Sequence, residues 1–133
     1  MTFSLREMTA EDGPALNRLF GESPDSGAVQ VAQKILIDPV QFLTLEPETV
    51  VVVATHPDHN GIAGCGLVTM LDVRLQGQVY RAAYLSTLSV HPAARRRGLA
   101  TRITQWRIDH AESAAGEDVV VFESVLLAHR LPQ

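Results

Sequence analysis

The chain has 133 residues, 46% of them hydrophobic, and a formal net charge of −4. Its length suits one domain, which we expect to span residues 1–133. It contains no apolar run of the roughly 20 residues that a membrane helix needs and no amino-terminal secretion signal, so we expect a cytoplasmic protein with no membrane partner. The acidic balance argues against duplex nucleic acid as the main ligand, because such proteins usually carry a basic face. A single cysteine, Cys65, excludes an internal disulfide framework.

A short strand followed by two helices is expected near the amino terminus. Residues 3–6 alternate apolar and polar, as a half-buried strand does. Residues 9–12 resemble a capping box that opens a helix, and the apolar side chains of residues 15–20 follow at helical spacing. A second helix is expected to carry the apolar residues between 31 and 36. It should end at Pro39, because the residue before a proline disfavours helical backbone.

Three strands are expected in the middle of the chain. Residues 49–54 are rich in β-branched valine, which favours a buried strand. An Asn-Gly pair marks a turn over residues 57–61, since both residues tolerate positive φ. The partner strand spans 62–75, a second turn follows at 76–78, and residues 79–90 return. The predicted arrangement is an antiparallel meander.

A long helix and a last strand complete the predicted fold. Four large side chains recur at the spacing of one helix face, which we expect to pack on the sheet: Leu99, Ile103, Trp106 and His110. Gly116 is expected to end this helix. Residues 118–122 should then pair in parallel with residues 79–90, because a helical crossover joins them. The prediction is an α/β fold with a mixed sheet, an antiparallel meander plus a parallel pair, and helices on both faces.

The junction between strand 79–90 and the long helix carries the most informative motif. His91-Pro92 ends the strand, three arginines occupy 95–97, and Gly98 precedes the helix. The first N–H groups of a helix lack partners and attract anions, and a glycine lets the backbone approach a ligand closely. Loop amides beside arginine side chains therefore indicate an anion site. An arginine run alone is also typical of a solvated basic turn or of a nucleic-acid or sorting patch.

This junction resembles the acyl-CoA signature of the GNAT superfamily of N-acetyltransferases. Arg95-x-x-Gly98-x-Ala100 fits the pattern Arg/Gln-x-x-Gly-x-Gly/Ala, and residues 88–92 fit the Leu-x-Val-x-Pro lead-in. The resemblance implies a GNAT-like fold with acetyl-CoA as co-substrate. It implies that the loop amides hold the pyrophosphate and that the strand ahead of the loop pairs with the pantetheine arm. The cofactor-binding residues that it implies are Leu88, Ser89, Val90, Arg95, Arg96, Arg97, Gly98, Leu99, Ala100 and Thr101.

The resemblance weakens towards the carboxyl terminus. Members of the superfamily usually add a helix, often with a tyrosine general acid, and a closing hairpin. Residues 123–133 carry no motif for these elements, and no tyrosine follows Tyr84. We therefore expect a short or atypical carboxyl terminus in which the helix and the hairpin are missing. Either a homodimer covers the exposed edge of strand 118–122, or the chain is a truncated or degenerate acyltransferase.

Direct attack of a neutral amine on the thioester carbon is the reaction that the resemblance implies. Many members place a glutamate base on the strand before the loop, at a position that is Ser86 here. A hydroxyl is a poor base alone, but it can hold a water that passes the proton on. Tyr84 is a candidate acid or a wall of the acceptor groove, while Asp72 and Glu22 are either further base candidates or solvated carboxylates. Cys65 is expected to be a buried structural thiol rather than a nucleophile.

The predicted function is transfer of an acetyl group from acetyl-CoA to an amine of a small molecule or peptide. No metal site is expected, because no cysteine or carboxylate stands at ligand spacing from the histidines. A non-catalytic CoA-binding or sensor domain that keeps the loop is an alternative. So is an interaction or nucleic-acid module built on the arginine cluster, although the acidic net charge and the lack of interleaved aromatic residues argue against it.

Overall fold

A computed structural model describes residues 2–22 and 39–123 of the chain. The elements in chain order are β1 (Ser4–Glu7), a 3-10 turn (Ala10–Asp12), α1 (Gly13–Glu22), α2 (Pro39–Leu43), β2 (Thr49–His56), β3 (His59–Leu75), β4 (Gln78–Val90), a second 3-10 turn (Pro92–Ala94), α3 (Leu99–Ala115) and β5 (Val120–Glu123). None of the described helices is long and apolar enough to cross a membrane.

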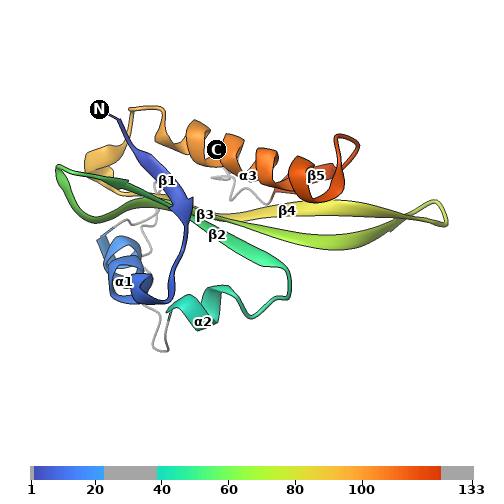
Figure 1. Cartoon of the computed structure of the whole chain (residues 1–133), viewed down its shortest axis with the longest axis horizontal. Coiled ribbons are helices and arrows are strands. Elements are labelled where there is room, and N and C mark those ends of the chain that lie inside the picture. Colours follow the sequence, from blue (N-terminus) through green and yellow to red (C-terminus); the bar gives the residue numbers. More distant parts are fainter. Residues whose placement is uncertain (1, 23–38, 124–133) are drawn as a thin grey trace, which may run out of the picture.

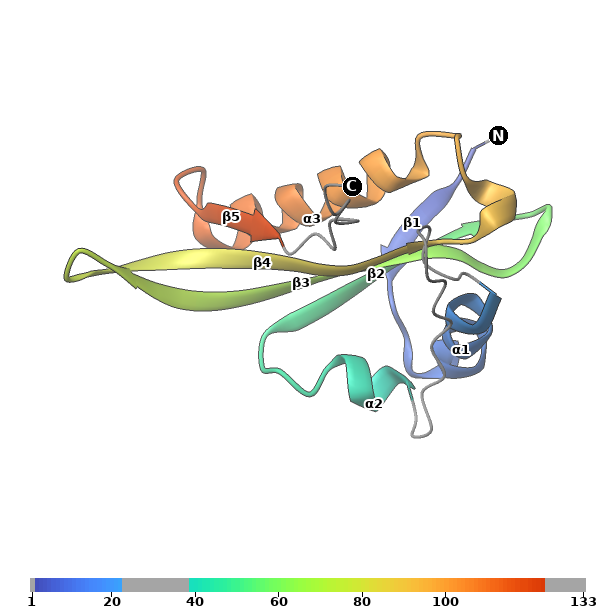
Figure 2. The same cartoon turned by 180° about the vertical axis from the view of Figure 1, so that it is seen from behind.

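The strands form one mixed sheet in the order β1-β2-β3-β4-β5. The first four pair antiparallel, and β5 pairs parallel with β4. Helix α3 crosses one face of the sheet, and α1 and α2 lie against the other (Figures 1 and 2). The expected α/β fold, with a meander, a parallel pair and helices on both faces, is therefore confirmed.

The alternation of side chains along the central strands builds a core on each face. On the α1 side, Val51 and Val53 pack with Leu16, Leu19 and Phe20, which are the helical residues expected from their spacing. On the α3 side, the neighbouring β2 residues pack with the start of the long helix in a second cluster: Phe3, Val52, Ala54, Ala63, Ala94, Leu99 and Ile103. Because β2 and β3 are buried on both faces, they form a rigid support for the strand that precedes the motif.

The expected capping signal before α1 is present in the structure. The backbone N–H of Thr9 donates to an Asp12 carboxylate oxygen at 2.7 Å, and Arg6 forms a two-pronged contact with the same carboxylate at 2.8 and 3.0 Å. The hydrogen bond from Arg6 and that from the Thr9 backbone lower the pKa of Asp12 despite its burial. This ion pair ties β1 to the start of α1.

Pro39, which was expected to end the second helix, is the first residue of α2. A proline is tolerated in the first turn of a helix, where its missing N–H has no intrahelical acceptor to lose. The rest of the expected second helix, with its apolar residues at 31–36, lies outside the described residues.

The predicted face of α3 was also wrong in part. The buried row is Leu99, Ile103, Arg107 and Ala111. Trp106 and His110 are half-buried beside that row and stack on each other, with ring centroids 5.6 Å apart. Hydropathy patterning places an arginine on the surface, whereas here the helix carries its guanidinium into the sheet.

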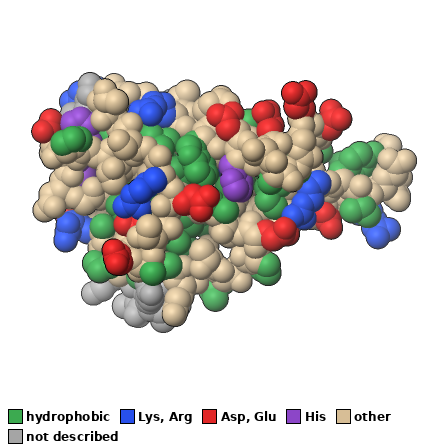
Figure 3. All heavy atoms as spheres, in the orientation of Figure 1, with side chains coloured by type: hydrophobic (Ala, Val, Ile, Leu, Met, Phe, Trp, Pro, Cys, Tyr) green, Lys and Arg blue, Asp and Glu red, His purple; other side chains and the backbone are tan. Residues whose placement is uncertain are grey.

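The β3–β4 hairpin extends beyond the rest of the sheet (Figure 1). The pairing of β3 with β2 reaches only Thr69, and residues 70–75 pair with β4 alone. Hydrophobic side chains lie exposed on this extension (Figure 3), among them Leu75, Val79 and Tyr80. The turn between β2 and β3 is shorter than the expected 57–61, since β3 begins at His59. Gly61 therefore belongs to the strand, where its φ is +101°.

Candidate active site

The loop between β4 and α3 is held by hydrogen bonds of its backbone and of the His91 side chain. The N–H of His91 donates to Ala63 O at 2.8 Å, so the strand pairing continues into the loop. The Nδ1 atom of His91 accepts the N–H of Ala93 at 3.1 Å, and the N–H of Ala94 donates to His91 O at 2.8 Å. Three consecutive bonds thus fix the 3-10 turn that leads to the arginines.

Several N–H groups beyond this turn remain available to a ligand. The first N–H of α3 with an intrahelical acceptor is that of Arg102, which donates to Gly98 O at 3.1 Å. Within the described residues, the N–H groups of Arg96, Arg97 and Gly98 have no acceptor either. Together with the N–H groups of the first helical turn, 99–101, they form the amino-terminal end of a long helix, where unpaired N–H groups and the helix dipole favour an anion.

The shape of the loop leaves space at this helix end. Gly98 has φ +74°, and a Cβ built on it would meet no heavy atom within 4 Å. Arg96 also has a left-handed backbone, with φ +66°. All three arginines are exposed, and Arg95 Nε donates to Val90 O at 3.2 Å, which fixes that side chain against the end of β4. Arginine charge and unpaired N–H groups therefore surround an open space that suits a diphosphate.

A β-bulge interrupts β4 just before the loop. Cys65 pairs with Ser89 and Leu67 pairs with Ser86, so Thr87 and Leu88 stand opposite a single residue of β3. Thr87 has φ +51°, and the Leu88 side chain is 43% exposed. An extra residue bends its strand and redirects backbone groups away from the ladder. Over the described residues, β5 accompanies β4 only as far as Leu85.

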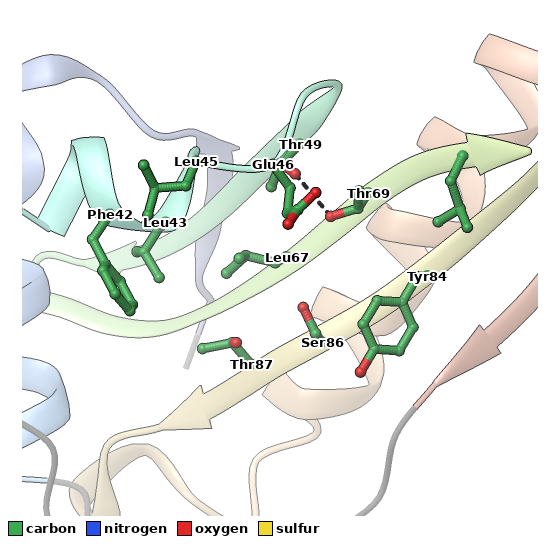
Figure 4. A pocket seen from close by; sticks show the side chains of 11 residues that line it. Phe42, Leu43, Leu45, Glu46, Thr49, Leu67, Thr69, Tyr84, Ser86 and Thr87 are labelled. Carbon is green, nitrogen blue, oxygen red and sulfur yellow. Dashed lines mark hydrogen bonds between the residues drawn. The ribbon is translucent and has the colours of Figure 1, made fainter.

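A cavity of about 500 Å³ opens on the α2 side of this bulge (Figure 4). The side chains of Tyr84, Ser86 and Thr87 reach it from β4 (Figure 4). The other lining residues come from α2, from the turn after it, and from β2 and β3: Phe42, Leu43, Leu45, Glu46, Thr49, Leu67, Thr69 and Leu71. The bulge thus has the middle of α3 on one side of the sheet and a hollow on the other, and the open end of α3 follows β4 beyond the bulge.

Residues 15–131 match the Acetyltransferase (GNAT) family. The chain belongs to this family. No curated protein matches the chain, but solved structures do. An acetyltransferase from Trypanosoma brucei is 18% identical, with a TM-score of 0.65 over 92% of this chain and 84% of that one.

Two further solved structures have the same fold. Glucosamine-6-phosphate N-acetyltransferase from Arabidopsis thaliana is 20% identical, with a TM-score of 0.67 over 94% of this chain and 84% of that one. Ribosomal-protein-alanine N-acetyltransferase from Brucella melitensis biovar Abortus 2308 is 13% identical, with a TM-score of 0.69 over 96% and 82%. At these identities the likeness shows the GNAT fold alone.

The structure separates the acid and base candidates of this GNAT chain into two groups. Ser86 and Tyr84 line the cavity, and the Tyr84 ring stacks on Phe122 of β5 with centroids 5.0 Å apart. Asp72 and Glu22 do not line it: Asp72 accepts from Arg81 at 3.2 Å on the hairpin, and Glu22 lies 3.2 Å from His91 Nε2. The two β4 residues are thus the predicted catalytic residues that lie beside the bulge.

Cys65 lies on β3 and is fully buried in the cluster that packs against α1, as expected. Burial raises the pKa of its thiol to about 12, although the nearby Arg107 charge acts in the opposite direction. A thiol with so high a pKa has almost no thiolate at neutral pH. Its environment is that of a structural residue.

The sequence analysis missed two residues that contact the bulge or line the cavity. Arg107 lies beneath the bulge, where it donates to Leu67 O at 3.2 Å and to Ser86 O at 3.3 Å. Burial lowers the pKa of this guanidinium. Glu46 brings the one carboxylate to the described lining of the cavity. Neither has a local sequence signal, because both depend on which strands lie next to them.

Proposed function

We propose that this protein is an N-acetyltransferase that moves an acetyl group from acetyl-CoA to an amine. The observation that carries the proposal is the pairing of the open helix end at Gly98 with the cavity at Ser86, on either side of one bulge. A diphosphate at the helix end would lie next to a strand that can guide an extended thioester to the bulge. The acceptor amine would then enter from the cavity.

The chemistry follows from this placement. Acetyl-CoA supplies a thioester, and transfer forms a C–N bond while the C–S bond breaks and the amine gives up one proton. The loop amides and Arg95–Arg97 would hold the diphosphate, and the strand backbone at Leu88–Val90 would orient the carbonyl. Ser86 would hold a water that accepts the amine proton, and Tyr84 would form the wall or donate a proton to the departing sulfur. Direct attack needs no acyl-enzyme, in keeping with the buried Cys65.

A non-catalytic CoA-binding domain is the second candidate, and Ser86 is the observation that favours it. A hydroxyl stands where many members carry a base. Thiol release from acetyl-CoA, followed with a chromogenic disulfide over a panel of primary amines, separates the two. Transfer predicts amine-dependent release together with a rise in Tm on addition of acetyl-CoA. A rise in Tm without release by any amine would point to a sensor, and neither response would refute both.

The cytoplasmic location and a homodimer formed over the β5 edge stay predictions. Light scattering at micromolar and higher concentrations tests the dimer, and a monomer throughout that range contradicts it.

A further inference from the structure

The acceptor cavity has two chemically different sides. One side is hydrophobic and is made by α2, the turn after it and β3: Phe42, Leu43, Leu45, Leu67 and Leu71. Phe42 is 47% exposed and Leu45 is 69% exposed, so the fold leaves a large part of this side to solvent. An apolar body of a ligand would cover these side chains and gain the free energy of that burial.

The other side carries hydroxyl groups and one negative charge. Thr49 and Thr69 bond to each other across β2 and β3 at 2.8 Å, and Ser86 and Tyr84 present further hydroxyls. Glu46 points into the same space (Figure 4). No lysine, arginine or histidine is among the described lining residues. A phosphate or carboxylate on the acceptor would therefore find no counter-charge and would face a carboxylate.

The turn that carries Glu46 also carries Glu48, and the two carboxylates differ in their partners. Glu48 pairs with Arg81 on β4, and Arg81 also binds Asp72. Glu46 has no ion pair within the described part of the chain and faces the cavity. An ammonium group is the ligand chemistry that matches a carboxylate beside an apolar wall.

We infer that the cavity selects a primary amine on an apolar body and that Glu46 binds the ammonium form of that amine. This inference rests on the proposed function, and it names the acceptor class of the same site. Glu46 acts here as a specificity residue: the bound ammonium group releases one proton to solvent water before the neutral amine attacks, and the second proton leaves through the water held by Ser86. The size of about 500 Å³ suits a small molecule rather than a folded protein surface.

An acceptor panel tests the class. Phenethylamine and hexylamine represent apolar amines, glucosamine 6-phosphate an anionic amine, kanamycin a polar polycation, and an alanine-initiated pentapeptide a chain terminus. We expect kcat/KM for the two apolar amines to exceed that for each of the others by about tenfold or more, as one unpaired charge in a site costs. A higher kcat/KM for glucosamine 6-phosphate, kanamycin or the peptide would overturn the assignment.

Paired variants test the role of Glu46. E46Q should raise KM for phenethylamine about tenfold, leave KM for acetyl-CoA unchanged and change kcat less than KM. E48Q is the matched control, because it removes a carboxylate from the same turn outside the cavity, and its KM for phenethylamine should equal that of the wild type. Equal KM values for E46Q and wild type would remove Glu46 from the acceptor site.

A binding measurement keeps this inference separate from the proposed function. Calorimetry of phenethylamine with the CoA complex needs no turnover, and E46Q should weaken binding about tenfold relative to E48Q. Amine binding of this kind without thiol release would refute the transferase and keep the inferred occupant. Thiol release with a polar amine alone would support the transferase and refute the inferred apolar occupant.

Discussion

The two faces of the sheet at the β4 bulge are built differently. On the α3 face, Gly64 and Gly66 remove side chains from β3, so that Ile103 and Arg107 approach the strand backbone closely. On the α2 face, the neighbouring strand positions carry Leu67 and Ser86, and a cavity is left above them. The α3 face is closed by this packing, which fixes the bulge, while the α2 face is open and leaves room for a ligand. One face of β4 is therefore held in place by tight packing, and the opposite face borders an accessible cavity.

The largest expected effect comes from filling the open space at the helix end. G98L places a side chain where no atom lies within 4 Å and where the proposal puts the diphosphate. We expect the affinity for acetyl-CoA, measured by calorimetry, to fall by about thirtyfold or more, because several N–H groups lose their ligand together.

G77L is the matched control for this variant. Gly77 has φ +81°, and its Cβ would likewise meet no atom, but it lies at the tip of the β3–β4 hairpin. Both variants carry the same left-handed strain of about 1–2 kcal/mol, while G77L should bind acetyl-CoA as the wild type does. Equal affinities for G98L and the wild type would show that the diphosphate lies elsewhere.

The R107A variant tests the packing of α3 on the closed face by truncating a side chain of the helix. This change removes three hydrogen bonds, to Leu67 O, Ser86 O and Thr104 Oγ1, and leaves a cavity between α3 and the bulge. We expect the free energy of unfolding, from urea titration, to fall by about 2–4 kcal/mol. R102A removes an arginine from the exposed side of the same helix, where it donates to Phe3 O, and should cost about 1 kcal/mol. Equal losses for the two variants would contradict a special role for the buried guanidinium.

The fold and the position of the loop before α3 could be predicted because their signals are local, and anion binding by this loop stays a prediction. Arg95, Gly98 and Ala100 are close in sequence, and the β-branched run of β2 and the spacing in α1 each identify one element. The cavity could not be predicted, since Phe42, Glu46 and Tyr84 come from three segments that only the sheet brings together. Arg107 was left out of the predicted buried face of α3 for the same reason: its acceptors are carbonyl groups of β3 and β4, which no pattern within α3 reveals.

A smaller loss of stability is expected when the same packing is disturbed by a substitution on β3. In G66A the new Cβ would lie 2.7 Å from Ile103 Cγ2 and 3.0 Å from Arg107 Nε. We expect a loss of about 1–3 kcal/mol in the free energy of unfolding, the range for overpacking in a core. G21A is the control, because this glycine of α1 has open space and a helical environment, and it should gain about 0.5–1 kcal/mol. The same sign for both variants would mean that α3 is not packed tightly on Gly66.

The smallest effect concerns the start of α1, which borders the open face, and it depends on pH. Asp12 is an acid whose folded pKa is lowered, chiefly by its hydrogen bonds with Arg6, from an ordinary value of 3.8. Its contribution is therefore complete above that ordinary pKa and is lost as the pH falls through the lower folded value. D12N should cost about 1–2 kcal/mol at pH 7, because a charge-assisted pair becomes a neutral contact.

The difference between wild type and D12N in urea titrations should shrink steadily as the pH is lowered from 4 towards 2. R102A again serves as the control, since its loss should not change over that interval. A D12N deficit that is constant from pH 7 to pH 2 would mean that the Asp12 side chain acts through its shape alone. The start of α1 would then be as insensitive to acid as the closed face, whose carbonyl–guanidinium contacts do not titrate in this range.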